Sequence, residues 1–333
     1  MRKVLLTLII VVQCVAMVGH VLGSGSTREV GTAELANSRR DAQQQGGDPD
    51  FNPQVARPAY LKSHPKVLID EAHNNADTFR GRYKPFADLI ASDGYRVVPN
   101  TEGFSRETLT GCRVLVVVNA AGSPGQTGIS PFTEKELNAV WDWVSKGGGL
   151  LLITDHAPYT AAAAAISRRF EVEITQGYTI DTSKYNKESE DQTELVFTRA
   201  EGLLAEHAIT RGRDATEQIK RIITFAGTSL KGPPKSVAII RLSDTAMDVL
   251  PPDRKPSSSP EEPLPEHKPV SAAGRAQGVA LEVGLGRVVV LGDAAMLTAQ
   301  VGPRGYRFGM NVSGTDNRQL ALNLMHWLSG LLK

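Results

Sequence analysis

Short apolar runs alternate with amphipathic segments along the middle of this 333-residue chain. The runs at 66–70, 113–118 and 150–154 are apolar at successive positions, which is typical of strands buried on both faces. The segments at 78–94 and 133–149 separate these runs and have apolar residues at helical spacing. This alternation predicts an α/β fold of the doubly wound type, a mostly parallel sheet with helices on both faces.

Local signals sharpen the expected elements. Thr133 followed by Glu136 is a capping box at the start of the second helix, and the glycines at 147–149 end it. A further helix is expected at 159–170. The second half is more mixed, with a short helix at 201–212 and strands at 219–230 and 236–242. A hairpin at 277–293, turning at Gly284 and Gly286, and a closing helix at 317–332 complete the domain.

The first 23 residues have the pattern of an export signal. Arg2 and Lys3 precede a long apolar stretch at 4–22, and Gly23 is a small residue suited to cleavage. The stretch is also long enough to remain as a membrane anchor. We therefore expect an exported protein, periplasmic or extracellular, and membrane contact only through residues 4–22 if they are not removed.

Two segments are expected to lack regular structure. Residues 24–64 are polar and aperiodic, which predicts a disordered spacer, and residues 251–269 form a proline-rich loop. We expect one α/β domain over 65–333 with this loop inside it.

Composition excludes some classes of function. Lysine and arginine number 37 against 36 acidic residues, so the chain lacks the basic excess of a nucleic-acid binder. Cys14 and Cys112 are the only cysteines, and loss of the signal leaves one. Cys112 begins an apolar strand and is expected to be a buried structural thiol rather than a nucleophile.

Polar residues gather after the predicted strands, where open α/β sheets bind ligands. The catalytic candidates are two histidines and an acid: His156, Asp155 and His73. The candidates for ligand binding follow the same strands or precede the last helix: Asp70, Glu71, Asn74, Asn119, Asp293 and Asn311. No cofactor is implied, and no metal is expected, although neutral imidazole and carboxylate could hold zinc or manganese. Such a site would use His73, Asp155, His156 and Asp293.

Structural roles compete with these assignments. Asp155 could cap the helix that begins near Tyr159, and Asp316 or Asn317 could cap the last helix. Asp70 could accept hydrogen bonds from loop amides. Asn74 and Asn75 could be turn residues.

Several catalytic motifs are missing. The glycines before 150–154 precede a strand, whereas a phosphate loop follows one, and no G-x-G-x-x-G follows a strand. The sequence has no G-x-S-x-G, no H-E-x-x-H and no paired-cysteine zinc motif.

The order of five segments resembles the class I glutamine amidotransferase-like superfamily, which is flavodoxin-like in fold. The segments are AVWDWVSKGGG, LLLITDHAP, HAIT.G at 207–212, VGLGRVVVLGD and DNRQLALNLMHWL. Within the superfamily the chain is most similar to an exported or membrane-associated branch resembling ThuA-like and GIFT domains. The likeness covers roughly 65–333 and implies the fold and the position of the cleft.

The resemblance also bears on activity. Amidotransferases of this class have a cysteine on the turn after a central strand, with a histidine and a glutamate downstream. Here Asp155 and His156 occupy that turn, and His156 matches a histidine that ThuA-like domains tend to have there. The resemblance therefore argues against glutamine hydrolysis.

Three functions follow as expectations. The first is binding of a small polar molecule, such as a carbohydrate, at the carboxyl edge of the sheet. The second is a hydrolase that uses a histidine–aspartate general base or a divalent metal. The third, suggested by the GIFT likeness, is a scaffold subunit of a membrane-associated complex. The sequence identifies no protein partner.

Overall fold

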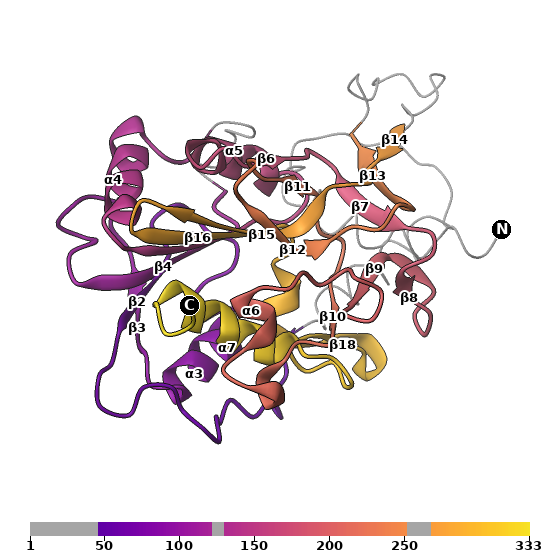
Figure 1. Cartoon of the computed structure of the whole chain (residues 1–333), viewed down its shortest axis with the longest axis horizontal. Coiled ribbons are helices and arrows are strands. Elements are labelled where there is room, and N and C mark those ends of the chain that lie inside the picture. Colours follow the sequence, from indigo (N-terminus) through magenta and orange to yellow (C-terminus); the bar gives the residue numbers. More distant parts are fainter. Residues whose placement is uncertain (1–45, 122–129, 252–267) are drawn as a thin grey trace, which may run out of the picture.

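A nine-stranded sheet forms the centre of the molecule (Figure 1). The computed structural model describes residues 46–121, 130–251 and 268–333. Five parallel strands make up one half of the sheet, in the order β3-β2-β4-β5-β16. Their bounds are Arg96–Asn100, Lys66–Asp70, Cys112–Val118, Gly149–Ile153 and Gly286–Leu291.

The rest of the sheet is antiparallel. β15 pairs with β16 in the predicted hairpin, β11 and β6 continue from β15, and β12 also pairs with β15. Their bounds are Ala276–Val283 for β15, Leu230–Lys231 for β11, Glu173–Ile174 for β6 and Val237–Arg241 for β12. The mostly parallel doubly wound sheet, the C-terminal hairpin and the closing helix are therefore confirmed.

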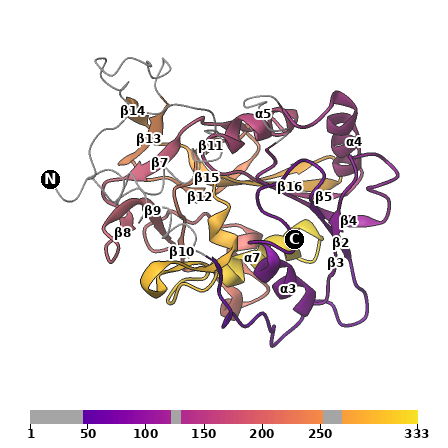
Figure 2. The same cartoon turned by 180° about the vertical axis from the view of Figure 1, so that it is seen from behind.

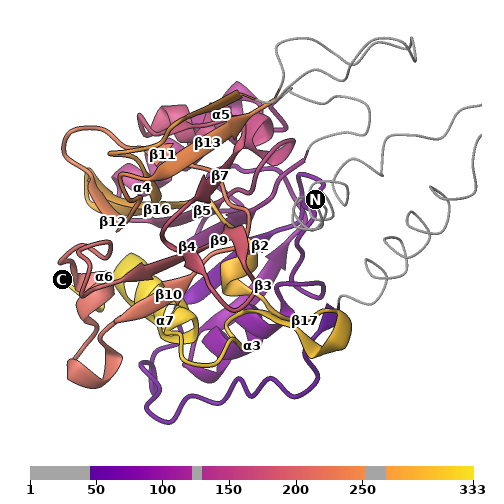
Figure 3. The same ribbon diagram turned by 90° about the vertical axis from the view of Figure 1, so that its right-hand side faces the viewer.

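Helices cover both faces of the sheet, as Figures 1 and 3 show. α3 (Lys84–Ser92) and α7 (Asn317–Leu328) pack on one face, in a core that includes Val67 and Ile69. α4 (Glu134–Ser145) and α5 (Tyr159–Arg169) pack on the other, in a core that includes Leu68. Successive residues of β2 thus enter opposite cores, as the two-residue period of a strand requires.

The start of the second helix is as the sequence predicts. The Thr133 hydroxyl accepts a hydrogen bond from the Glu136 amide at 3.3 Å, and Glu136 Oε2 accepts one from the Thr133 amide at 2.9 Å. This capping box satisfies two amide groups that the helix leaves unpaired.

The three glycines after α4 each meet a different requirement. Gly147 has φ +112°, which favours glycine. A Cβ at Gly148 would lie 2.4 Å from the Trp143 ring, and one at Gly149 would lie 2.4 Å from the Leu328 carbonyl oxygen. The helix end and the first residue of β5 are therefore packed against an indole and against the end of α7.

Some helix and strand bounds differ from prediction. Residues 78–83 form turns before α3, since the Gly81 and Tyr83 amides both donate to the Thr78 carbonyl. The strand expected at 219–230 is split into β10 (Arg221–Ile223) and β11. The helix expected at 201–212 is only α6 (Ala208–Arg211), and α7 ends at Leu328.

Small sheets in the second half were not predicted. Their orders are β10-β9-β8 and β14-β13-β7, which are labelled in Figure 2, and β1-β17-β18. Apart from the eight-residue β9 and from β10, which lies in the strand expected at 219–230, these strands have two to five residues. Their bounds are β1 Gly46–Gly47, β7 Tyr178–Asp181, β8 Tyr185–Asn186, β9 Asp191–Thr198, β13 Ala246–Leu250, β14 Lys268–Ser271, β17 Ala299–Val301 and β18 Arg307–Gly309. Single helical turns occur at Ala215–Glu217, Ala295–Leu297 and Pro303–Gly305.

Residues 46–64 pack on the domain, whereas the sequence predicts a disordered spacer over 24–64. Phe51, Val55 and Tyr60 pack against the α3 and α7 core, and the Ala59 amide donates to Asp93 Oδ1 at 2.8 Å. For this part the spacer expectation is wrong, because a few apolar residues at irregular spacing are enough to hold the segment on the domain. Residues 24–45, the apolar stretch at 4–22 and most of the proline-rich loop lie outside the described residues.

In the described part of the chain, no helix combines the length and apolar character needed to cross a bilayer.

Candidate site at the carboxyl edge of the sheet

The parallel strands bring several predicted site residues to one edge of the sheet. The Asn119 amide donates to the Ile153 carbonyl at 3.1 Å, and the Thr154 amide donates to the Leu291 carbonyl at 3.0 Å. Since Val118 pairs with Ile153 and Ile153 pairs with Leu291, the segments that follow β4, β5 and β16 leave the sheet together. Asp155 and Asp293 each stand two residues beyond such a pair.

Three carboxyl groups lie close enough to act on one another through their charges, and we call Asp77, Asp155 and Asp293 the carboxyl cluster. The hydroxyl of Tyr83 marks their proximity, because burial and then the charges of all three acids raise its pKa well above the usual value. Tyr83 is fully buried and donates to the Ala294 carbonyl at 2.8 Å. Only Asp155 and Asp293 were singled out from the sequence.

Asp293 is the most enclosed member of the cluster. Its side chain is fully buried, and its two oxygens accept hydrogen bonds from the amides of Met296, at 2.6 Å, and Phe225. Burial, and then the nearby charge of Asp155, raise the pKa of Asp293 well above its usual range. Asp293 therefore supports the loops around the site from within.

Asp155 is accessible. Its side chain is 17% exposed, and its Oδ1 accepts the His156 amide at 2.8 Å. Burial raises the pKa of Asp155, and the neighbouring His156 offsets only part of this effect. The helix-cap alternative for Asp155 is wrong, because Pro158 is the N-cap of α5 and that helix has no side-chain cap.

His156 lies beside Asp155 and is partly exposed. Its Nε2 is 4.0 Å from Asp155 Oδ1, its Nδ1 is 2.9 Å from the Ala157 carbonyl, and the Ala157–Pro158 peptide bond that follows is cis. The side chain is 14% exposed, so the imidazole is not enclosed in the core. Asp155 and His156 are thus partly exposed at the ends of the central strands, where a ligand can reach them.

Asp77 and Asn119 contribute buried atoms that lack a hydrogen bond. Asn119 Nδ2 donates to Asp77 Oδ2 at 2.7 Å, whereas Asp77 Oδ1 and Asn119 Oδ1 accept none from the described residues. Arg82 Nη1 lies 3.5 Å from Asp77 Oδ1, and burial nevertheless raises the pKa of Asp77. Both side chains are at least 97% buried, and unsatisfied acceptors at such depth are costly.

His73 belongs to a separate group of residues. Its Nδ1 lies 2.8 Å from Asp70 Oδ2 and its Nε2 lies 3.0 Å from Glu136 Oε1. Its ring packs against Phe104 and Phe132, with centroids 4.6 and 4.5 Å away. These phenylalanines belong to the α4 and α5 core, whereas Tyr83 belongs to the α3 and α7 core.

The surroundings of His73 favour its charged form. Burial lowers the pKa of His73, but the hydrogen bonds and charges of Asp70 and Glu136 outweigh burial and raise it. With a carboxylate on each ring nitrogen, His73 has no nitrogen to offer a substrate. Asp70 also accepts the Ala72 amide at 3.3 Å, as the loop-amide alternative expected.

The remaining predicted ligand-binding residues have local partners. Glu71 Oε1 accepts the Phe79 amide at 2.7 Å, and Asn74 adopts φ 51°. Asn75 links the His73 amide, at 3.2 Å, to the Val118 carbonyl, at 2.8 Å. Asn311 donates to Asp48 Oδ2 at 2.8 Å, so its amide is tied to the β1-β17-β18 sheet.

The last helix begins without a side-chain cap. Asp316 is its N-cap by position, but Asp316 Oδ2 accepts the amides of Lys220 and Arg221 instead. Asn317 is fully buried and binds the Ile223 amide and carbonyl, at 3.0 and 2.7 Å, and the Met296 carbonyl at 3.0 Å. Both side chains fix the loops around the carboxyl edge to α7.

Unfavourable backbone conformations occur at this edge. Asn119 has φ 41° and Ala226 has φ 54°, and Ala226 follows the residue whose amide binds Asp293. Such conformations cost on the order of 1–3 kcal/mol and are concentrated at functional sites.

The four residues considered as metal ligands do not form one cluster. His73 binds Asp70 and Glu136, while Asp155, His156 and Asp293 lie in the other group. Among the described residues, no set of three or more histidine, cysteine, aspartate or glutamate side chains is arranged to hold a metal ion.

The cysteine lies far from this edge. Cys112 starts β4, at the opposite end of the strand from Asn119, and donates to the Val114 carbonyl at 3.1 Å. Burial raises the pKa of its thiol to about 11, so the thiol is protonated at neutral pH.

Comparison with solved structures identifies the fold. The mmIFT52 N-terminal domain has a TM-score of 0.54 and 12% identity, over 80% of this chain and 97% of that domain. The protein shares the fold of this domain. Two further structures share 12–16% identity and score lower. They are a ThuA-like protein from Bacteroides uniformis (0.41; 82% of this chain, 95% of that chain) and a GMP synthase subunit from Thermoplasma acidophilum (0.40; 81% and 97%).

No protein-family model and no curated protein sequence matches the chain. The similarities establish the fold alone. The turn after β5 carries Asp155 and His156.

Sequence reasoning missed Asp77, Arg82 and Tyr83. Asp77 was within reach, because it lies in the same loop after β2 as His73 and only four residues further on. Arg82 and Tyr83 were assigned to a helix that begins after them.

Proposed function

We propose that the protein is an exported domain that binds a carbohydrate or similar polyhydroxylated small molecule at the carboxyl edge of its sheet. The observation that supports this proposal most is the partly exposed pair Asp155 and His156 at this edge, with Asp77 and Asn119 buried nearby and each keeping an acceptor oxygen without a hydrogen bond. Acceptors of this kind are complementary to a ligand with several O–H donors.

The balance of donors and acceptors favours this ligand class. The carboxylate that the site presents is that of the partly exposed Asp155, with the buried acids Asp77 and Asp293 behind it, and the cationic or donor groups are Arg82 and His156. A sugar can donate to carboxylates through its hydroxyls without bringing a further negative charge. A phosphorylated or acidic ligand would be repelled by the same carboxylates.

A pair of matched variants tests the proposal. Asp155→Asn keeps the oxygen that accepts the His156 amide but loses the charge, and Asp244→Asn makes the same change at an exposed position. Titration calorimetry against a panel of neutral mono- and oligosaccharides should find one ligand whose Kd rises about tenfold in Asp155→Asn, or roughly 1.4 kcal/mol. Equal affinity in both variants, or no saccharide bound by the unaltered protein, would contradict it.

Export is part of the proposal and has its own test. It is supported by Arg2, Lys3 and the apolar stretch at 4–22. Sequencing the amino terminus of the protein from the exported fraction should find a start near residue 24. A start at Met1 in a membrane fraction would instead support an uncleaved anchor.

A hydrolase is the second candidate, because His156 lies beside Asp155 in an accessible position and the pKa of Asp155 is raised. A histidine and an acid so placed can exchange protons with a substrate. The binding domain and the hydrolase are distinguished by measuring turnover of the bound saccharide or of its nitrophenyl glycoside. A binding domain gives none, whereas a hydrolase gives turnover that falls at least 100-fold in His156→Gln with Kd little changed.

A further inference from the structure

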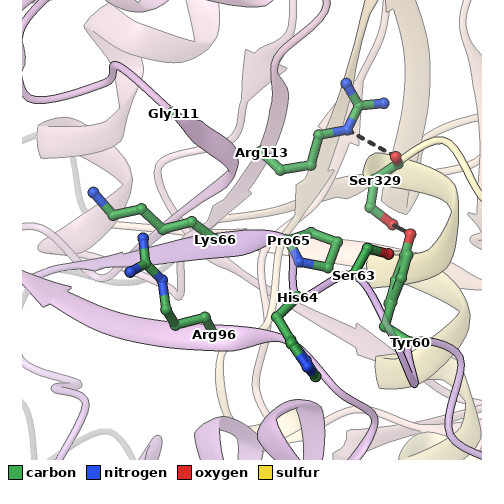
Figure 4. Close-up of a pocket in the computed structure, with 9 residues that line it drawn as sticks. All are labelled: Tyr60, Ser63, His64, Pro65, Lys66, Arg96, Gly111, Arg113 and Ser329. Atoms are coloured by element: carbon green, nitrogen blue, oxygen red, sulfur yellow. Dashed lines mark hydrogen bonds between the residues drawn. The ribbon is translucent and has the colours of Figure 1, made fainter.

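A cavity of about 420 Å³ lies at the opposite, amino edge of the sheet, where β2, β3 and β4 begin (Figure 4). Lys66, Arg96 and Arg113 line it, together with the hydroxyl-bearing Ser63 and the backbone of Gly111. This cavity contains none of the residues at the carboxyl edge, so it is independent of the proposed saccharide site.

Lys66 and Arg96 are cross-strand partners. They pair in register at the start of the parallel strands β2 and β3, and in Figure 4 their cationic groups extend to the same side. Like charges placed directly opposite on neighbouring strands are destabilising. Within the described ranges, no carboxylate forms an ion pair with either side chain.

Arg113 adds a third positive charge that is held in place. Its Nε donates to the Ser329 carbonyl at 2.7 Å and its Nη1 to the Gly147 carbonyl at 3.0 Å. Both acceptors are neutral, so the guanidinium keeps its full charge in the cavity wall. The Ser329 hydroxyl next to it lies 2.9 Å from the Tyr60 hydroxyl.

Gly111 forms part of the cavity wall. Its φ is +71°, which favours glycine, and a Cβ at this position would meet no atom within 4 Å, so the wall is open to solvent here.

We propose that this cavity binds the phosphate group of a small molecule or of a lipid headgroup. A phosphate dianion would neutralise the like charges of Lys66 and Arg96, with two parallel bonds from the guanidinium and a point charge from the ammonium. A single carboxylate would offset only one of the cations.

The test compares two double variants of the full chain. Lys66→Gln/Arg96→Gln removes the paired cations, and Lys231→Gln/Arg241→Gln removes one lysine and one arginine from exposed strand positions elsewhere. The probes are inorganic phosphate, followed by calorimetry and by thermal shift, and vesicles that contain phosphatidic acid, whose headgroup is a phosphomonoester, followed by co-sedimentation. Neutral phosphatidylcholine vesicles are the blank.

The expected result is saturable binding of at least one probe that weakens tenfold or more in the cavity variant and less than twofold in the control. Phosphate bound without vesicles indicates a soluble ligand, and vesicles bound more tightly than phosphate indicate a headgroup. Arg96→Gln alone changes an exposed residue and should fold normally. It should lose part of the binding affinity, which keeps the proposal testable if the double variant misfolds. No binding of either probe, or equal loss in both double variants, would overturn the proposal.

Discussion

Asp155 and Asp293 follow adjacent parallel strands at matching positions, and the charge of Asp155 contributes to the raised pKa of Asp293. An acid whose pKa is higher in the folded than in the unfolded state contributes stability below its unfolded pKa, near 4. That contribution is lost as the pH rises through the folded value. The carboxyl cluster should therefore reduce stability toward neutral pH, as is common for functional sites.

Asp155→Asn should relieve this repulsion. We expect the variant to be more stable than the unaltered protein at pH 8, by about 1 kcal/mol, and equal to it near pH 4. Urea unfolding at both pH values measures the difference, with Asp244→Asn as the control. Parallel pH profiles for all three proteins would show that Asp155 does not act on its neighbours in this way.

His73→Gln should leave Asp70 and Glu136 without their shared cation. Breaking a buried ion pair typically costs about 3 kcal/mol, and we expect a loss of that order at pH 6. Because the pKa of His73 is raised, its contribution is complete below about pH 6.5 and is lost as the pH rises through the folded value. The difference in the free energy of unfolding between His73→Gln and the unaltered protein, measured by chemical denaturation, should therefore become smaller from pH 6 to pH 9.

The exposed His64 provides the control for that experiment. His64→Gln should change stability by less than about 0.5 kcal/mol at any pH. A His73→Gln penalty that stays constant with pH would mean that the imidazole acts through packing against Phe104 and Phe132 alone.

Asn317→Ala should cost about 2 kcal/mol or more, because the change leaves the Ile223 amide, the Ile223 carbonyl and the Met296 carbonyl without a buried partner. Asn52→Ala removes only an exposed hydrogen bond to the Gln54 amide and should have little effect. Equilibrium unfolding of both variants tests this. If Asn317→Ala and Asn52→Ala had the same free energy of unfolding, the Asn317 hydrogen bonds would contribute no stability, because water would replace them.

Phe51→Ala tests whether residues 46–64 stabilise the domain. Phe51 packs against the α3 and α7 core, so we expect a loss of about 1.5 kcal/mol. Leu61 lies in the same segment but is 77% exposed, and Leu61→Ala should be neutral. If the two variants unfold alike, the segment contributes no stability through Phe51.

The core of the fold could be predicted because its signals are local. The capping box of Thr133 and Glu136 predicts the start of α4 from only four residues. The uninterrupted apolar runs predict β2, β4 and β5. The site was harder, because its partners are distant in sequence. Glu136 is predicted as a cap, but its contact with His73 spans 63 residues and depends on how α4 lies against the end of β2.

The competing role of Asp155 shows the same limit. An aspartate shortly before a helix is a strong capping signal, yet here the backbone turns through His156 and Pro158 first, and the carboxylate accepts the His156 amide instead. Strands β6, β7 and β8 could not be predicted either, since two to four residues give too little periodicity to recognise.

The glycines at 147–149 should not tolerate substitution equally. At Gly148 the obstacle to a methyl group is the Trp143 side chain, which can move or be replaced by a smaller residue. At Gly149 the obstacle is the backbone of α7, which cannot retreat without displacing the closing helix. Related proteins should therefore exchange positions 148 and 143 together, while position 149 stays glycine wherever the last helix keeps its place.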